Sequence, residues 1–301
     1  MRHLVFICSF MLLLAGCALP VTDVPQASYS SITAETRKET MDILDKYVGA
    51  RQRLIQAAGP LWLANAKLCP RRAFTTGFVV YSDFDLPKPL RDVAYERLLL
   101  GSDAVVLATL PGSDAWDKGI RAGDALMTMD GKRVRNAAEA RARLRNIKEE
   151  KTITFGFLRD GRAFEVPIKL QEMCNYPVTY LAGDREINAW ADGKQIGVTQ
   201  GMVDFTNDRE LGVVIGHELA HNIMHHIPKH EVNAVGVIVI GTIIDGLALV
   251  AGIDPDMRHK LEAAYTHVWS AKFEQEADYV GLYLLARGGG DMSVAAPFWR
   301  K

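Results

Sequence analysis

The sequence predicts an α+β protein, in which a mainly helical domain with a small β-sheet is combined with an inserted β-rich domain. Two patterns carry this prediction. Residues 210–227 place apolar side chains at helical spacing and stop at Pro228, which cannot continue a helix. Residues 71–171 instead alternate short strand-like runs with turns at Asp130-Gly131 and Asp160-Gly161. A length of 301 residues also fits two domains.

Composition narrows the class of protein without naming a function. Hydrophobic residues make up 49% of the chain, charged residues 24%, and the formal net charge is −1. These values are typical of a globular protein. A net charge near zero, without a basic run, argues against a nucleic-acid partner.

The start of the chain has the pattern of an export signal. A short, positively charged start precedes the apolar run Leu4–Ala15, whose 12 residues are too few for a stable membrane span. The run leads into Leu14-Ala15-Gly16-Cys17, which resembles the lipobox of bacterial lipoproteins. The resemblance implies removal of residues 1–16 and a lipid anchor on Cys17. Ala18 implies the outer membrane of a Gram-negative bacterium, with the protein facing the periplasm. The alternative is an ordinary signal peptide with a buried cysteine nearby.

We expect residues 17–70 to form a lipid-anchored tether followed by one helix. Residues 18–31 are polar and include two prolines, which favours an extended linker. Thr33–Ala58 carries a partial apolar stripe, and Gly59-Pro60 predicts the end of that helix.

Residues 71–172 are predicted to form the β-rich domain. Ala73–Tyr81 and Val105–Leu110 are strand-like, and a helix is expected at about residues 137–147. The run from Pro111 to Asp124 reads P-G-S-D-A-W-D-K-G-I-R-A-G-D. It resembles the signature P-G-S-P-A-x-x-A-G-L-x-x-G-D of an HtrA-type PDZ domain.

The PDZ resemblance implies peptide binding. PDZ domains add an extended peptide to a sheet edge and hold its C-terminal carboxylate on backbone amides. By resemblance, the carboxylate-binding loop lies near Thr76-Gly77-Phe78. The alternative is a PDZ fold that serves only as a structural spacer.

Cys69 and Cys174 bracket the predicted PDZ domain. Because the ends of a PDZ domain lie close together, the resemblance places both thiols at its stem. In an oxidising periplasm the two are expected to form a disulfide. The alternative is a pair of reduced, unrelated thiols.

A metal site is predicted on the helix at residues 210–227. His217-Glu218-Leu219-Ala220-His221 is an H-E-x-x-H motif, and residues four apart share one helix face, so both imidazoles can reach one metal ion. Glu218 can then take the proton from an attacking water, as in zinc hydrolases. Asn207 and Glu210 form an N-x-x-E pair that predicts the start of the helix.

Two further segments of residues 173–301 extend the pattern. Asn188-Ala189 lies in one of two short strands joined by Asp192-Gly193, and the segment Phe273–Asp278 reads F-E-Q-E-A-D. Together with the H-E-x-x-H helix, these segments resemble the zinc endopeptidase family that includes HtpX, BepA, LoiP and the CaaX prenyl endopeptidases. The resemblance covers about residues 178–299 and implies a zincin-type metallopeptidase domain.

The family resemblance assigns a role to each residue of the site. It implies one zinc ion per chain, held by His217, His221 and Glu274, with Glu218 as the base. Asp278 would orient an imidazole, which is a usual supporting role around zinc. An edge strand containing Asn188 and Ala189 would hold the substrate backbone.

Helix geometry separates Glu274 from its neighbour Glu276. Glu274 and Asp278 are four residues apart and share a helix face. Glu276 is two residues from each, about 200° around the helix axis, so we expect it to face away from the metal. Gly288-Gly289-Gly290 predicts the end of this helix.

Three features leave alternatives open. His225, His226 and His230 follow the motif closely; on helical spacing His225 could compete for the metal, and a solvated or supporting role is the alternative. The apolar run Val232–Ile253 contains Asp245, which favours a buried or groove-covering helix over a membrane-dipping loop. Relatives continue past a segment like Phe298-Trp299 to a Thr-His-Pro motif that this sequence lacks; either the chain is shortened or this branch does without it.

Three functions compete on this basis. The first is a periplasmic, outer-membrane-anchored zinc metalloendopeptidase that cuts unfolded or misassembled envelope proteins, with the PDZ domain capturing their C-terminal tails. The second is a chaperone-like outer-membrane assembly factor with a structural or rarely used zinc site. The third is a PDZ tethering module on an inactive peptidase fold. Glu218 favours the first, because binding alone does not need a base. The expected partners are protein or peptide substrates, with unfolded outer-membrane proteins among the candidates, and the membrane itself.

Overall fold

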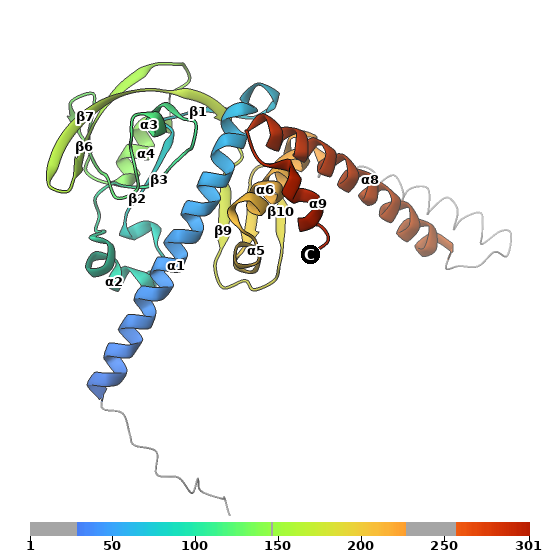
Figure 1. Ribbon diagram of the computed structural model, residues 1–301, viewed down its shortest axis with the longest axis horizontal. Coiled ribbons are helices and arrows are strands. Elements are labelled where there is room, and N and C mark those ends of the chain that lie inside the picture. Colours follow the sequence, from blue (N-terminus) through green and yellow to red (C-terminus); the bar gives the residue numbers. More distant parts are fainter. Residues whose placement is uncertain (1–28, 146, 227–256) are drawn as a thin grey trace, which may run out of the picture.

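The computed structural model describes residues 29–145, 147–226 and 257–301 (Figure 1). The export signal, Cys17, His230 and the run Val232–Ile253 lie outside the described residues. Helices and strands are both abundant, which is compatible with the predicted α+β class. None of the described helices is both long and apolar enough to cross a membrane.

The elements follow one another in a mixed order along the chain. The α-helices are α1 (Tyr29–Ala64), α2 (Lys88–Leu98), α3 (Asp114–Asp117), α4 (Ala137–Arg145), α5 (Gln200–Phe205), α6 (Asp208–Ile223), α8 (Met257–Arg287) and α9 (Ala295–Phe298). The strands are β1 (Arg72–Thr75), β2 (Phe78–Tyr81), β3 (Val105–Thr109), β4 (Ala125–Met129), β5 (Lys132–Arg133), β6 (Thr152–Arg159), β7 (Arg162–Lys169), β8 (Gln171–Cys174), β9 (Val178–Leu181), β10 (Ala189–Ala191) and β11 (Ile196–Thr199). Short 3₁₀ turns occupy residues 66–68, 83–85 and 292–294.

Helix α1 runs between the β-rich domain and the C-terminal helices and contacts both (Figure 1). The predicted end at Gly59-Pro60 is wrong, because α1 continues through Pro60 to Ala64. Pro60 has no backbone N–H and leaves one carbonyl of the preceding turn without its helical donor. The next two residues, Leu61 and Trp62, are buried in the main core, and this packing outweighs the missing hydrogen bond.

The β-rich domain is built on a six-stranded sheet in the order β2-β3-β4-β6-β7, with β5 paired to β4. The strand-like run Ala73–Tyr81 is divided into β1 and β2 at Thr76-Gly77, where Gly77 has a φ of 78°, a left-handed conformation that favours glycine. Phe78, Phe155 and Phe157 fill a separate core under this sheet, with the Phe78 ring 5.2 Å and 5.6 Å from the other two.

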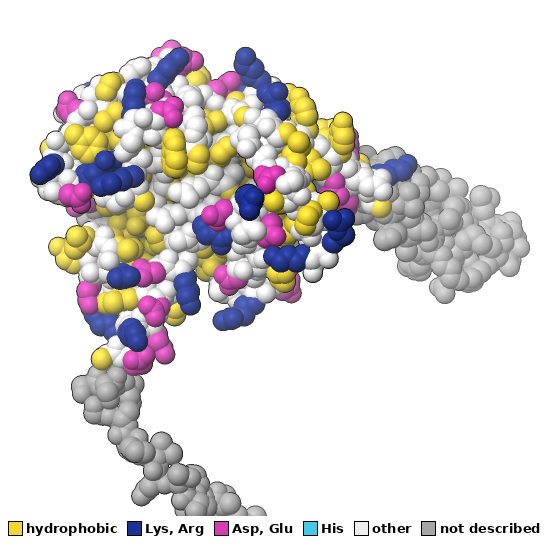
Figure 2. Space-filling view, in the orientation of Figure 1, with side chains coloured by type: hydrophobic (Ala, Val, Ile, Leu, Met, Phe, Trp, Pro, Cys, Tyr) yellow, Lys and Arg dark blue, Asp and Glu magenta, His cyan; other side chains and the backbone are white. Residues whose placement is uncertain are grey.

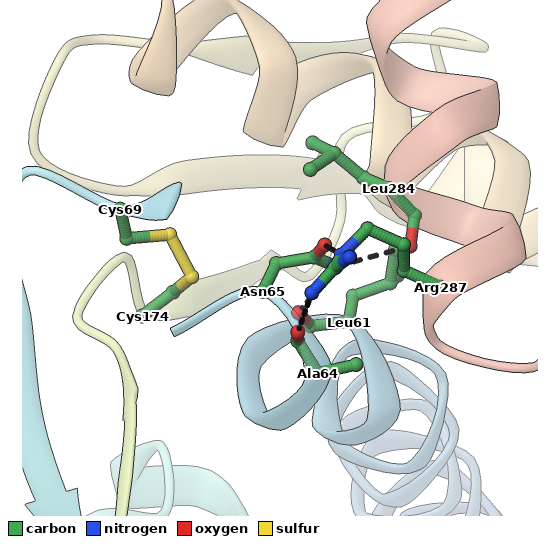
Figure 3. The surroundings of a disulfide bond; sticks show 7 residues. All are labelled: Leu61, Ala64, Asn65, Cys69, Cys174, Leu284 and Arg287. Carbon is green, nitrogen blue, oxygen red and sulfur yellow. Dashed lines mark hydrogen bonds between the residues drawn. A yellow bond between two sulfur atoms is a disulfide. The ribbon is translucent and has the colours of Figure 1, made fainter. Parts of the chain in front are cut away.

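A two-stranded stem joins this domain to the rest of the chain. Strand β1 pairs antiparallel with β8, and Arg72 lies opposite Cys174. Cys69 and Cys174 form a disulfide there, with their Cα atoms 5.4 Å apart and 105 residues apart in sequence (Figure 3). The two ends of the inserted segment are thus held together by backbone pairing and by one covalent bond.

Next to the disulfide, Asn65 ties the end of α1 to the end of α8 (Figure 3). Its side-chain nitrogen donates to the carbonyls of Leu61 at 2.9 Å and Leu284 at 3.0 Å, and its side-chain oxygen accepts from Arg287 Nε at 3.0 Å. Asn65 is fully buried, and all its side-chain polar atoms are paired, so it fixes where α8 leaves the core.

The C-terminal part packs α6 against α8 beside a small sheet. Strand β11 pairs parallel with β9 and antiparallel with β10, so β10 is an edge strand of the order β10-β11-β9. The predicted strands around Asp192-Gly193 are therefore confirmed as β10 and β11. Helix α8 ends at Arg287, directly before the glycine run predicted to stop it.

Basic and acidic side chains are intermixed over the face shown in Figure 2, which agrees with the net charge of −1. On that face neither sign of charge forms a continuous stripe.

Candidate metal centre

Helix α6 starts where the sequence predicts. The Asn207 side-chain oxygen accepts from the backbone N–H groups of Arg209 and Glu210, and the Glu210 carboxylate accepts from the Asn207 N–H at 2.9 Å. The capping box is thus complete and satisfies N–H groups that a helix start leaves unpaired.

The end of α6 differs from the prediction of a helix to residue 227. The helix stops at Ile223, and His225 adopts a left-handed conformation with a φ of 56°. This reversal turns His225 outward, where it is exposed, and brings the buried His226 back to the metal-binding face. The spacing argument that could bring His225 to the metal is therefore wrong, because His225 is not helical.

Three side chains converge between α6 and α8. The Nε2 atoms of His217 and His221 are 3.1 Å apart, and the Glu274 Oε2 atom lies 3.2 Å from the first and 3.6 Å from the second. These three atoms form a group able to hold one metal ion. The two histidine side chains are 12% exposed and Glu274 is 54% exposed, so the group opens to solvent on the α8 side.

The donor set fits zinc. Zinc binds imidazole nitrogen and carboxylate oxygen at about 2.0–2.2 Å, which places tetrahedral donors roughly 3.3 Å from one another. The three measured separations lie close to that value. Two histidines and one glutamate are also the ligand set of catalytic zinc sites that keep one position for water or substrate.

Asp278 contacts the far nitrogen of the first ligand. Its Oδ1 atom lies 2.9 Å from His217 Nδ1, so that nitrogen donates its proton to the carboxylate and Nε2 keeps a free lone pair. This is the orienting contact that the family resemblance implies for Asp278.

Glu276 lies outside the group of metal-ligating atoms, in line with the prediction, but it is connected to the site through a histidine. Its Oε2 atom lies 3.0 Å from His226 Nε2, and His226 Nδ1 lies 3.0 Å from His221 Nδ1. The helical-wheel argument separated Glu276 from the metal and from Asp278, but it could not show this indirect contact. The returning chain after α6 fills the space between Glu276 and the second ligand.

The electrostatics of the metal-free site suit its proposed roles. Burial, followed by the charge of neighbouring His217, lowers the pKa of His221 to about 4, so His221 is neutral at neutral pH, as a metal ligand must be. Burial, followed by the negative charge of Glu274, raises the pKa of Glu218 to about 8. A dication bound by Glu274 would offset the negative charge of Glu274, lower the pKa of Glu218 and so favour the Glu218 carboxylate.

Sequence similarity covers the region that carries this cluster. Residues 162–300 match Peptidase family M48. The matched segment contains His217, Glu218, His221 and Glu274, so the motif, the geometry and the similarity all point to a metallopeptidase domain.

Curated relatives extend this finding. The chain is 32% identical over 110 residues to mitochondrial metalloendopeptidase OMA1 of Arabidopsis thaliana, covering 36% of this chain and 22% of that protein. It is 28% identical over 137 residues to metalloendopeptidase OMA1 of Bos taurus, covering 41% and 26%. It is also 38% identical over 68 residues to a probable periplasmic serine protease do/HhoA-like of Haemophilus influenzae, covering 23% and 15%. The chain therefore spans between 15% and 26% of the length of these relatives.

The two residues of the predicted substrate-binding pair, Asn188 and Ala189, point their backbone groups to opposite sides of the edge strand. Asn188 donates its N–H to Thr199 Oγ1 at 3.1 Å, and its carbonyl accepts from the Thr199 N–H at 3.1 Å, so its backbone groups are turned toward β11. Because backbone direction alternates along a strand, Ala189 and Ala191 present their backbone groups at the edge of β10 that pairs with no other strand of the described residues.

Asn222 fastens this edge strand to the metal-binding helix. Its side-chain oxygen accepts from Gly193 N–H at 2.7 Å, and its side-chain nitrogen donates to the Gln195 carbonyl at 3.1 Å. In the sequence Asn222 only follows the H-E-x-x-H motif directly, and no local pattern indicates its contacts. An amide side chain next to the motif could have indicated a structural hydrogen bond, but the sequence does not identify Gly193 and Gln195 as the partners.

The loop predicted to hold a peptide carboxylate lies immediately before edge strand β2. The Gly77 N–H donates to Thr75 Oγ1 at 3.0 Å, and the Phe78 N–H approaches Thr76 Oγ1 at 3.4 Å. From α4, Arg141 donates to the Val80 carbonyl of β2 at 3.1 Å. A peptide bound at this loop and strand would therefore have to replace these hydrogen bonds with hydrogen bonds of its own.

Proposed function

We propose that this protein is a zinc metalloendopeptidase that hydrolyses unfolded or misassembled proteins of the bacterial envelope. The observation that carries the catalytic part is the convergence of His217 Nε2, His221 Nε2 and Glu274 Oε2 next to Glu218. The match of residues 162–300 to Peptidase family M48 and the similarity to two metalloendopeptidases support it.

The residues of the site divide the chemistry between them. Zinc held by His217, His221 and Glu274 would polarise the scissile carbonyl and lower the pKa of the attacking water. Glu218 takes the proton from that water on a carboxylate oxygen and passes it to the leaving amide nitrogen. Asp278 keeps the His217 Nδ1 protonated, so that Nε2 faces the metal.

A substrate segment would lie along β10 as an added strand. Ala189 and Ala191 offer their backbone groups at this free edge, which can pair with an extended peptide. Trp299, which is 49% exposed and whose ring lies 5.5 Å from that of His217, offers an apolar surface beside the metal ligands. Recognition through backbone pairing suits unfolded chains, because folded proteins rarely present free strands.

Capture of C-terminal tails by the β-rich domain is part of this proposal. Among the described strands β2 pairs only with β3, so its other edge, behind the Thr76-Gly77-Phe78 loop, would receive the peptide as an added strand in the manner of a PDZ domain. Similarity to a periplasmic serine protease over 68 residues is compatible with it.

The proposed location is the periplasmic face of the outer membrane, with Cys17 carrying the lipid. Its support is the lipobox-like Leu14-Ala15-Gly16-Cys17 and the disulfide between Cys69 and Cys174, which is a bond of oxidising compartments.

Proteolysis of casein by the full chain purified in detergent tests the proposed activity. We expect digestion that stops with a chelator and returns when zinc is added. A protein that binds zinc and leaves casein intact, yet suppresses the aggregation of unfolded outer-membrane proteins, would favour the chaperone-like function instead.

A further inference from the structure

We propose that His226 and Glu276 together position the second metal ligand, His221. In this arrangement Glu276 acts on the metal site through one intervening imidazole, and we call these three residues the relay. The inference rests on the metal site of the proposed function and adds two positioning residues to it.

The relay is continuous in the structure. His221 Nδ1 lies 3.0 Å from His226 Nδ1, and His226 Nε2 lies 3.0 Å from Glu276 Oε2. The ring of Phe273 stacks on that of His226, with centroids 4.8 Å apart and planes at 20°. His226 is 2% exposed, so its position is set by packing as well as by its hydrogen bonds.

Only one arrangement of protons satisfies both hydrogen bonds of the relay when His221 binds a metal through Nε2. His221 needs a free lone pair on Nε2 toward the metal, so its proton lies on Nδ1. That proton is donated to His226 Nδ1, which therefore carries its own proton on Nε2. His226 Nε2–H in turn donates to the Glu276 carboxylate. Glu276 thus selects the tautomer of His226, and His226 selects that of His221.

The two histidine ligands are supported in parallel. Asp278 contacts His217 directly at 2.9 Å, whereas Glu276 reaches His221 only through His226. Both carboxylates come from α8, on either side of Ala277, and their different positions around that helix explain why one needs an intermediary. The left-handed turn at His225 supplies it by returning His226 to the site.

The test compares variants of the full chain by zinc affinity and by the visible spectrum of the cobalt-substituted protein. Glu276→Ala should weaken zinc binding about 10–100-fold, the usual effect of losing a group that supports a ligand. It should also shift the cobalt bands, because the His221 ring loses its fixed orientation. Glu276→Gln keeps an acceptor oxygen and should restore part of the affinity. Gln275→Ala, an exposed neighbour on α8, is the matched control and should behave as the parent.

A double-variant cycle separates a relay from two independent effects. Once His226→Ala has been introduced, adding Glu276→Ala should cause little further loss of affinity, because the connection to His221 is already broken. A second loss of the same size would overturn the relay. So would parental affinity and an unchanged cobalt spectrum in Glu276→Ala. If the parent itself bound no zinc, the proposed metallopeptidase function would fail first, and the relay with it.

Discussion

Gly281 of α8 lies directly against the backbone of His217 on α6. A Cβ atom at position 281 would come within 2.9 Å of both the Cα and the N of His217. From the other side, a Cβ at Gly216 would meet the Gly281 carbonyl oxygen at 3.0 Å. The two helices that carry the metal ligands are therefore in backbone contact at the first ligand, and this contact sets the distance from His217 to Glu274.

Gly281→Ala should separate the two helices and weaken metal binding. The added methyl group has only backbone atoms to displace, so neither helix can yield by rotating a side chain. We expect lower zinc affinity together with a loss of about 1–3 kcal/mol in the free energy of unfolding, as for other overpacked sites. Gly49→Ala on α1 is the control: nothing lies within 4 Å of its added atom, and it should be neutral or slightly stabilising. Parental zinc affinity in Gly281→Ala would contradict this account.

Asn222→Ala should impair substrate binding more than metal binding. The change removes both hydrogen bonds that hold the β10–β11 turn, to Gly193 and Gln195, but touches no ligand. We expect a higher KM for an extended peptide, with zinc content unchanged. Asn222→Asp retains the acceptor for the Gly193 N–H, so its KM should lie between that of the parent and that of Asn222→Ala. An unchanged KM in Asn222→Ala would show that the edge strand does not depend on this tie.

Glu218 should make the metal-free protein less stable as the pH rises. The pKa of Glu218 is raised from 4.5 to about 8 by folding, so the folded state holds this proton more tightly than the unfolded chain. Its contribution to stability is therefore complete below about pH 4.5 and is lost as the pH rises through about 8. Urea unfolding in chelator across this range should show a smaller decline for Glu218→Gln, which cannot ionise. If the free energy of unfolding fell equally with pH in both proteins, ionisation of Glu218 would not be the cause of the decline.

Loss of the Cys69–Cys174 disulfide should destabilise the β-rich domain more than the metal site. On the chain-entropy model, closing a loop of this length contributes up to about 4.7 kcal/mol. The double variant Cys69→Ala/Cys174→Ala should therefore unfold at lower urea concentration, and hydrogen exchange should rise first in β1 and β8. Equal loosening of α6 would show that the stem supports both parts alike. In the wild-type protein, non-reducing peptide mapping should recover the two cysteines as one linked species.

The sequence pattern predicted those features that depend only on the spacing of residues along the chain. His217 and His221 share a face because they are four apart, and the Asn207–Glu210 capping box depends on neighbours along the chain alone. The same holds for the strands around Asp192-Gly193 and for the stop after Arg287.

What the sequence did not predict depends on contacts between distant segments. The continuation of α1 past Pro60 depends on burial of Leu61 and Trp62 in a core assembled from both halves of the chain. The contact of Glu276 with His226 depends on a left-handed residue at 225, a conformation that histidine seldom adopts and no local motif marks. Helix α2 is an exception, because it was not anticipated although its buried residues Leu90, Val93 and Ala94 follow a helical spacing.

Zinc content and peptide hydrolysis, measured side by side in Glu218→Gln, test the central claim most directly. Glu218 is not a ligand in the cluster, so the variant should retain one zinc ion per chain. It should hydrolyse peptides about 10²–10⁴-fold more slowly than the parent, because the base that moves the proton is gone. A variant that keeps zinc and still digests protein at the parental rate would contradict the proposed mechanism.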